Sequence, residues 1–484
     1  MNLTNNYLEY SLQKILRQLS ITLFIFSINS VNANPWYSVE KEIIQIEIEQ
    51  LKLCGIDVPP VSAFPLNIVV LKNALEDIDQ SNLNEDCLSI INSIKKNLNN
   101  KNFYTHKNII GFQTQRPKIY FQDFGKRMVA DSNLYLSSSK VGHNFAYNIA
   151  LQVFSDDLRF DESYFSYYFN NHVLTLGRIS RWWSPSFNSS LILSNSARPS
   201  PGISFSNYMP KSMNTKYLSF LGPISYEFFL NRLESDRHIP NPLLFGNRVS
   251  INPNDRLKIS LFRTAQFGGD GRKENLSIFF DMLRGKDNFD SSFASKEDEP
   301  GNQLGGLDFN LLLLNNKNLS LYGQIVGEDE SGYLPSKTFY IIGAGYSWDL
   351  YKPKKLSFEY SDTGSRQINT TYNHSIYRDG YRYYGNPIGS AFGADSKQIG
   401  ISYNKTLRND SYLNIKVIKG SLNYNNSTTF FIEGLSDDFT IIEMKFNKSF
   451  SQKLYLKLGL QYSNFLDIVS YDNLSSYASL EYKW

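Results

Sequence analysis

Two stretches of the sequence combine arginine with tryptophan or tyrosine, residue types that can bind anionic groups and stack on the faces of rings. A guanidinium group can hold a carboxylate or a phosphate through two parallel hydrogen bonds. A flat indole or phenol ring can stack on the face of a pyranose. The candidate binding residues in these stretches are Arg181, Trp182, Trp183, Arg198, Arg378, Tyr381, Arg382, Tyr383 and Tyr384.

The same residue types also have purely structural uses. Trp and Tyr at the ends of a membrane barrel form interfacial girdles, and Arg in folded loops pairs with carboxylates such as Asp329, Glu330 and Asp379. For any single candidate the structural use is the more frequent one, because charged networks are often only structural. The binding prediction therefore concerns the set rather than each member.

Signals for catalysis or metal binding are missing from the sequence. The histidines, at positions 106, 143, 172, 238 and 374, lack HExxH spacing, and there is no CxxC pair, Walker loop or GxSxG elbow. The GGDG stretch at 268–271 precedes no predicted helix that would cradle phosphate, so it predicts a turn. The acidic run 328–330 could bind calcium, but nothing in the sequence sets the carboxylate separation that a glycosidase needs. We predict no enzymatic activity, no cofactor and no metal.

Charge and composition exclude further classes. The chain has 484 residues with 49 basic and 46 acidic side chains, a net charge of +3 that gives no strong field to attract nucleic acid. Aromatic residues make up 15% of the chain, yet its mean hydropathy is only −0.35. The two cysteines, Cys54 and Cys87, exclude a disulfide-dense scaffold.

The N-terminus has the pattern of a secretory signal. Lys14 and Arg17 precede the apolar run 19–28, and residues 31–33 place small side chains where a signal peptidase reads. The run has about half of the ~20 residues that a membrane-spanning helix needs. We predict a cleavable signal peptide over residues 1–33, and we find no later stretch apolar enough for a membrane helix.

Residues 34–110 are predicted to form a small helical domain. Apolar residues recur at spacings near three and four, Pro and Gly interrupt them, and three short helices fit, the third running through Cys87 and Ile91. Cys54 would end the first of these helices. A Cys54–Cys87 disulfide and two buried free thiols are both open readings.

After Gly111 the apolar period changes to two. Leu454, Leu456, Leu458 and Leu460 alternate with polar residues or glycine, and the same holds near 399–404 and 413–418. A membrane β-barrel with apolar residues outside produces this pattern, and so does a soluble sandwich. The last strand favours the barrel, because it ends at Trp484 with an aromatic pattern that resembles the recognition signal of the barrel-assembly machinery.

Loop lengths give a second argument for a barrel. Short turns are expected at 449–453, 407–410, 349–355, 315–318, 252–255 and 170–172. Long connections at 181–201, 268–304, 327–337, 364–396 and 424–437 alternate with them, as short periplasmic turns alternate with long extracellular loops in outer-membrane barrels. The length of 111–484 predicts about 18 strands.

Five ordered segments resemble the capsule assembly protein Wzi family. They are NPWYSVEKEIIQIEIEQLKLCGI from Asn34, GRISRWWSPSFNSSLILSNSARPSPGISFS at 177–206, GGDGRKEN at 268–275, GEDESGYLPSK at 327–337 and YNHSIYRDGYRYYGNPIG at 372–389. The resemblance runs from residue 34 to the C-terminus. The SAFGADS stretch that follows GNPIG and the pair of cysteines depart from the family pattern, which leaves the identity of the glycan open.

The resemblance implies a non-enzymatic lectin of the bacterial outer membrane. We expect a monomeric barrel over 111–484 with extracellular loops and a periplasmic helical domain, which contacts outer-membrane lipids and binds capsular or related surface polysaccharide. The candidate Arg, Trp and Tyr residues would lie in its long loops. The alternatives are a sugar-permeable channel, which a wide barrel would allow, and a hydrolase that uses His238 or His374.

Overall fold

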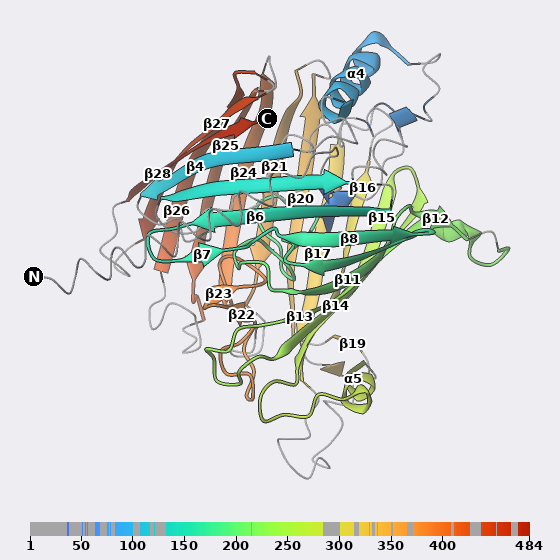
Figure 1. Cartoon of the computed structure of the whole chain (residues 1–484), viewed down its shortest axis with the longest axis vertical. Helices are drawn as coiled ribbons and strands as arrows, with labels where there is room; N and C mark the ends of the chain where they lie inside the picture. Colours follow the sequence, from blue (N-terminus) through green and yellow to red (C-terminus); the bar gives the residue numbers. More distant parts are fainter. Residues whose placement is uncertain are drawn as a thin grey trace, which may run out of the picture.

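The structure is a computed structural model in which a closed β-barrel carries a helix at one end and folded loops at the other (Figure 1). It describes residues 36–37, 51, 54, 56, 63–67, 75–76, 78, 83–99, 107–116, 121, 132–142, 144–213, 215–283, 301–313, 319–328, 330–331, 334–335, 337–349, 352–364, 371–407, 411–425, 437–451, 453–465 and 473–484. The predicted signal peptide, residues 1–33, lies outside the described residues.

Eighteen antiparallel strands form the wall in the described part of the chain, and the last of them pairs with the first. This confirms the predicted fold class. The strands are β4 (Lys107–Arg116), β5 (Asn133–Val141), β6 (Phe145–Val153), β8 (Tyr164–Phe169), β9 (His172–Gly177), β11 (Gly202–Asn207), β13 (Pro223–Arg232), β14 (Leu243–Asn254), β15 (Leu257–Phe267), β16 (Asn302–Leu312), β17 (Leu319–Glu328), β20 (Thr338–Trp348), β21 (Lys354–Asp362), β24 (Ser396–Leu407), β25 (Ser411–Leu422), β26 (Asp437–Ser449), β27 (Leu454–Phe465) and β28 (Leu474–Lys483).

Short strands complete the sheets. Two-residue segments β7 (Leu158–Arg159) and β12 (Lys211–Ser212) extend the wall beside β6 and β13. The remaining short strands pair as β1 (Trp36–Tyr37) with β3 (Leu66–Asn67), β2 (Ala63–Phe64) with β10 (Trp182–Trp183), β18 (Glu330–Ser331) with β19 (Leu334–Pro335), and β22 (Arg382–Tyr383) with β23 (Asn386–Pro387).

The wall has apolar residues outside and polar residues inside, as the period of two predicts. On β27, Leu460 is 52% exposed whereas its neighbour Gln461 is 3% exposed. Inward-facing charges are paired, and the Lys416 ammonium lies 3.2 Å from a carboxylate oxygen of Glu443 on the adjacent strand. Ion pairs of this kind lie inside the barrel, while the apolar outer face is left for a non-aqueous environment.

Short turns gather at one end of the barrel and long connections at the other, except that the long β11–β13 connection, residues 208–222, lies at the short-turn end. β26 ends at Ser449 and β27 begins at Leu454, and the other predicted short turns likewise fall between consecutive strands. The C-terminus and helix α4 (Glu85–Asn99) lie at the short-turn end, whereas β22, β23 and helix α5 (Leu276–Leu283) lie at the opposite end (Figure 1). The alternation is therefore confirmed for the turns and long connections predicted from the sequence, and the 208–222 connection, which the sequence did not indicate, departs from it.

Helix α4 is the third of the predicted helices. The Asn84 side chain begins it by accepting a hydrogen bond from the Cys87 backbone N–H at 2.8 Å. Cys87 forms a disulfide with Cys54, with the Cα atoms 5.7 Å apart. Leu51 has helical backbone, but most of the first two predicted helices lies outside the described residues. No helix in the described part of the chain combines the length and the apolar character needed to cross a membrane.

Candidate functional site

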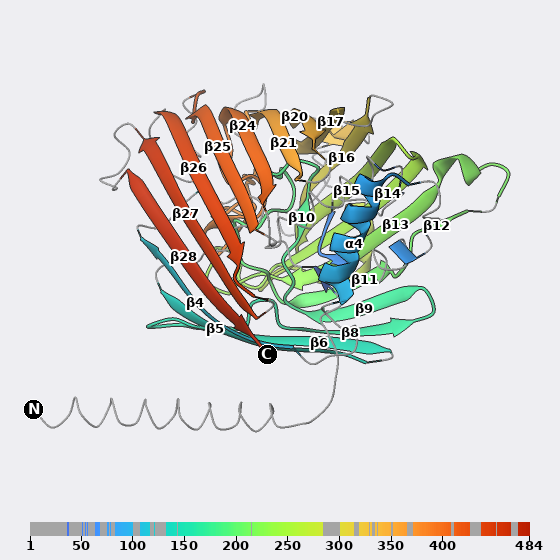
Figure 2. The same ribbon diagram turned by 90° about the horizontal axis from the view of Figure 1, so that it is seen from above.

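The connection between β9 and β11, residues 178–201, runs inside the barrel rather than above it, and we call it the inner segment (Figure 2). Its strand β10 pairs with β2 from the N-terminal region, so that Trp182 is opposite Phe64. Trp182 packs with Phe64 and with Ile91 of α4 in one apolar cluster, and its side chain is 0% exposed. The inner segment thus reaches the short-turn end and joins the helical region.

Inward-facing side chains of the wall hold the inner segment in place. The Ser186 hydroxyl donates to a carboxylate oxygen of Glu359 on β21 at 2.8 Å. The amide of Gln324 on β17 accepts a hydrogen bond from the Leu191 N–H at 2.8 Å and donates to the Trp183 carbonyl at 2.6 Å. Strand residues therefore satisfy the polar backbone of a buried loop, which an apolar lumen would leave unpaired.

A second segment, residues 371–395 between β21 and β24, covers the inner segment, and we call it the outer segment. The Tyr372 hydroxyl donates to the Leu191 carbonyl at 2.6 Å, and the Tyr381 hydroxyl donates to the Ile192 carbonyl at 3.0 Å. The Ser194 N–H donates to the Ile388 carbonyl at 2.8 Å. The inner segment, which extends through the barrel, and the outer segment, which covers it at the loop end, together form what we call the cap.

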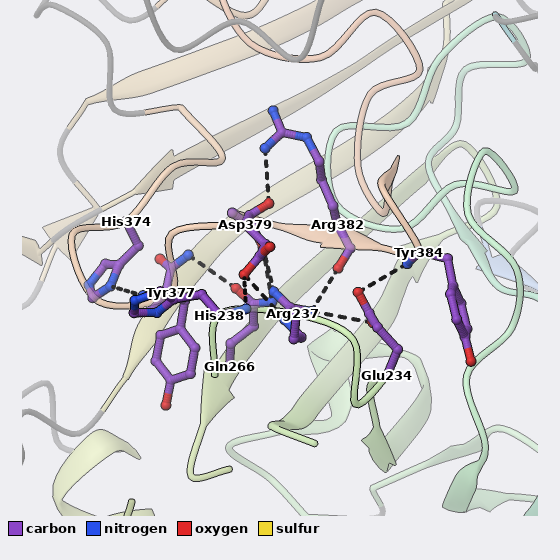
Figure 3. A network of polar contacts seen from close by, with 11 residues as sticks. Glu234, Arg237, His238, Gln266, His374, Tyr377, Asp379, Arg382 and Tyr384 are labelled. Carbon is purple, nitrogen blue, oxygen red and sulfur yellow. Dashed lines mark hydrogen bonds and ion pairs between the residues drawn. The ribbon is translucent and has the colours of Figure 1, made fainter. Parts of the chain in front are cut away.

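Arg237, in the connection between β13 and β14, fastens the outer segment to the wall (Figure 3). Its guanidinium donates to the carbonyls of Arg382 and Gly380, each at 3.1 Å, and lies 3.5 Å from the Glu234 carboxylate. The other Glu234 oxygen accepts a hydrogen bond from the Tyr384 N–H at 3.1 Å. One buried ion pair therefore determines where the β22–β23 hairpin lies.

The hairpin brings Tyr384 to a cluster of arginines. Arg198 makes two hydrogen bonds to the Asp161 carboxylate, at 3.0 and 3.2 Å, and its guanidinium lies 5.4 Å from the centre of the Tyr384 ring. Arg178 lies 3.7 Å from the same carboxylate, and the Asp161 side chain is 0% exposed. A single buried carboxylate thus holds two guanidinium groups beside an aromatic ring that is 53% exposed.

A hollow next to this cluster is lined by Ser180, Arg181, Ser194, Arg198, Ser200 and Tyr383, among others. The Arg181 guanidinium lies 2.8 Å from Glu227 and 4.4 Å from the ring centre of Phe229. The Tyr383 hydroxyl is neutral at physiological pH and able to donate a hydrogen bond, and burial, which raises its pKa to about 12, extends this state to alkaline pH. The hollow therefore offers neutral hydroxyls next to two guanidinium groups.

The candidate residues predicted from the sequence differ in exposure. Arg378 and Tyr384 are exposed, and Arg198 and Arg382 are half-buried. The others are buried in the cap or in its contacts with the wall, namely Arg181, Trp182, Trp183, Tyr381 and Tyr383. Their packing fits the structural use that the sequence left open. The cap brings Arg198, Tyr383 and Tyr384 to one place, and it separates Trp182 from them.

The sequence did not indicate three residues that organise the site, namely two carboxylates and the arginine that fastens the outer segment. Asp161, Glu234 and Arg237 lie in the shorter connections 154–163 and 233–242, where the sequence contains no recognisable motif. Asp379, one of the predicted ion-pair partners of loop arginines, has a carboxylate oxygen 3.9 Å from Nε of Arg237. The GGDG stretch forms a turn with Gly268, Gly269 and Gly271 at positive φ, as predicted. Within the described ranges, no group of three or more His, Cys, Asp or Glu side chains is placed to hold a metal ion.

Comparisons with known proteins agree with this architecture. The model of the family "Capsule assembly protein Wzi" matches residues 112–474. A Klebsiella pneumoniae protein of 55.8 kDa from the cps region is 32% identical over 231 residues, which are 46% of this chain and 45% of that relative. The match thus spans less than half the length of the curated relative.

A solved structure from Escherichia coli superimposes with a TM-score of 0.79 and 23% identity, covering 93% of this chain and 99% of the other. That protein is Wzi, an outer-membrane, carbohydrate-binding β-barrel involved in group 1 capsule assembly. At this identity the likeness concerns the fold. The family model, in contrast, spans most of the chain, so the chain belongs to the capsule assembly protein Wzi family.

Proposed function

We propose that this chain is an outer-membrane lectin that binds capsular or related surface polysaccharide and promotes its attachment and assembly at the cell surface. The observation that carries the proposal is the cluster of Arg178, Arg198 and Tyr384, which a buried carboxylate mounts on a tightly built cap. Family membership and the carbohydrate binding of the similar Escherichia coli barrel support it.

The proposed orientation places the loops outside the cell and the short turns and α4 in the periplasm. Loop lengths support it, since outer-membrane barrels have their long loops on the extracellular side. We propose that the protein acts as a monomer among outer-membrane lipids.

The proposed contact set consists of the candidates near the surface of the cap together with Arg178, which the sequence did not single out. Tyr384 would stack on a sugar ring, while Arg178, Arg198 and Arg378 would hold carboxylate, phosphate or hydroxyl groups. The buried candidates Arg181, Trp182, Trp183 and Tyr381 would position the loops, and Arg382 and Tyr383 would assist in holding polar groups of the sugar. Single contacts of this kind are weak, and a repeating chain bound by many protein copies would gain avidity.

A sugar-permeable channel is the alternative function, and the inner segment argues against it. Residues 178–201 occupy part of the lumen and contact β17 and β21. Arg181 lines both the hollow near Tyr383 and a second hollow on the α4 side, and its ion pair with Glu227 lies between them. In planar bilayers we expect no steady large conductance from the purified protein. A steady large conductance would count for the channel.

We further propose that the protein is not an enzyme. The imidazole Nδ1 of His374 faces the backbone N–H groups of Ile376 and Tyr377 at 3.2 and 3.4 Å, which is a turn-stabilising arrangement. His238 donates its backbone N–H to Asp379 at 2.8 Å. Purified protein should leave polysaccharide intact, and any cleavage that His238→Ala or His374→Ala abolishes would overturn this part of the proposal.

Capsule retention on cells tests the lectin function. In an encapsulated bacterium that depends on this protein, deletion of the gene should move polysaccharide from the cell surface into the medium. Arg178→Ala combined with Tyr384→Ala should do the same in part, at unchanged protein level. Tyr346→Ala, which removes an exposed aromatic ring from the wall, is the matched control. Unchanged attachment in the deletion strain would sink the proposal.

A further inference from the structure

An ordered flap leaves the barrel at the short-turn end, on the strand connection between β11 and β13. We define the flap as residues 211–221, of which residue 214 is not described. It comprises β12 and the 3-10 turn η2 (Ser219–Leu221) and projects away from the wall in both views (Figures 1 and 2). No barrel strand covers this projection.

The flap has a fixed conformation. Lys211 and Ser212 pair with Ile224 and Pro223 at the start of β13. Beyond them, the N–H groups of Leu218 and Ser219 donate to the Thr215 carbonyl at 3.2 and 3.0 Å. The backbone that follows the flap is closely packed as well. Gly222 has a φ of 65°, and a Cβ atom on it would lie 1.8 Å from the Asn252 carbonyl oxygen. Backbone hydrogen bonds and close packing therefore order a segment whose side chains have little to pack against.

The apolar side chains of the flap are nevertheless exposed. Tyr217 is 80% exposed and Phe220 is 66% exposed, and Met213 and Leu218 are exposed beside them. A contiguous group of large exposed apolar side chains on an ordered loop marks an interaction surface rather than a random surface. Lys211 and Lys216 are exposed in the same flap, so the surface combines aromatic rings with positive charge.

The outer face of the neighbouring wall indicates what the flap binds. Phe169, Phe205, Tyr226 and Phe228 form a continuous ladder of rings with centres 5.9 to 6.4 Å apart, on the strands that flank the flap. Phe169 ends β8 at a short turn, so the ladder reaches the short-turn edge of the apolar wall. Aromatic rings at such an edge mark the level of the lipid headgroups. The flap begins at this level, since Tyr226 lies two residues from Ile224, the partner of Lys211.

We propose that the flap is a membrane-interface anchor, which inserts Tyr217, Leu218 and Phe220 among the phospholipids at the short-turn end of the barrel. Lys211 and Lys216 contact the phosphates of anionic headgroups. Aromatic and apolar side chains combined with lysines are the chemistry of interfacial segments that bind anionic lipid surfaces. The anchor fixes the tilt and depth of the barrel, so that the cap at the opposite end is held at a constant height. The inference rests on the membrane location proposed above, and not on polysaccharide binding.

Site-specific fluorescence tests the anchor on the full-length protein. Because Cys54 and Cys87 are joined, a single introduced cysteine is available for an environment-sensitive dye. The test position is Phe220→Cys, and the controls are Leu261→Cys on the outer wall, where Leu261 is 60% exposed, and Ser375→Cys in the outer segment. The protein is placed in vesicles of phosphatidylethanolamine and phosphatidylglycerol, with or without bromine on the acyl chains as a quencher.

We expect blue-shifted emission and strong quenching by brominated lipid at 220, as at 261, and neither at 375. Lys211→Glu with Lys216→Glu should reduce the quenching at 220 without changing that at 261. A water-like, unquenched dye at 220 together with a quenched dye at 261 would overturn the anchor while leaving the barrel in the bilayer. An unquenched dye at 261 would overturn the membrane location itself, and polysaccharide binding by the same samples is measured separately.

Discussion

The wall and the cap are built by different means, although both place polar side chains inside the barrel. The wall repeats one local rule, in which side chains alternate between the two faces and backbone hydrogen bonds run from strand to strand. The cap has no repeat, and its order depends on individual contacts such as that between Tyr372 and the Leu191 carbonyl. We therefore expect a single substitution to lower the free energy of unfolding less in the wall than in the cap.

Truncation of a buried cap residue should show the difference most strongly. We expect Trp182→Ala to lower the free energy of unfolding by ~3–5 kcal/mol, because it empties the junction between the inner segment and the helical region. Leu261→Ala on the outer wall should cost ~1 kcal/mol or less in micelles, where detergent fills the vacated space. Denaturant unfolding in detergent measures both, and equal losses would contradict the contrast.

Removal of the shared carboxylate should have the next largest effect. Asp161→Asn leaves Arg178 and Arg198 without their common anion, and we expect a loss of ~1–3 kcal/mol in the free energy of unfolding. The matched control is Asp157→Asn, which breaks a more exposed pair with Arg159 and should cost ~1 kcal/mol or less. If the control were the more damaging change, the cluster at Asp161 would not organise the cap.

Alkaline pH should loosen the cap before the wall. Burial raises the pKa of Tyr377 and of Tyr383 to about 12, from an ordinary value of 10.0. Folding therefore keeps these phenols neutral, so their stabilising contribution is complete below pH 10 and disappears as the pH rises through about 12. Proteolysis of the loops should accelerate in this window while the β-sheet signal in circular dichroism persists. Simultaneous loss of both signals would contradict a separate opening of the cap.

The smallest effect on stability should come from the exposed tip of the hairpin. Tyr384→Ala removes a ring that is mostly outside the cap, and we expect a change within ~0.5 kcal/mol in the free energy of unfolding. The same substitution should weaken polysaccharide binding. A large loss of stability would assign Tyr384 to the structure of the cap instead.

The sequence predicted the wall well because its signals are local. The period of two in 454–462 and the turn residues near 449–453 are read within about ten positions, and they predict where strands run and turn. The number of strands was predicted from the length of 111–484. The C-terminal aromatic pattern and helix α4 are local in the same sense.

The cap could not be predicted in this way. Ser186 bonds to a partner 173 positions away, Leu191 to one 133 positions away and Asn188 to one 214 positions away. Nothing near Trp182 in the sequence shows that the segment turns into the lumen, so a buried Trp and an exposed sugar-stacking Trp look alike there. The family resemblance located the right segments, but only the fold separates Tyr384, at the surface, from Tyr381, beneath it.

Binding of purified polysaccharide by the purified protein tests the central claim most directly. Titration calorimetry in detergent should give saturable binding that Arg178→Ala with Tyr384→Ala weakens by about tenfold or more, or ~1.4 kcal/mol. Tyr217→Ala with Phe220→Ala, at the other end of the barrel, should leave the affinity unchanged. Equal affinity of the loop variant and the unmodified protein would contradict the assignment of the cap as the glycan-binding surface.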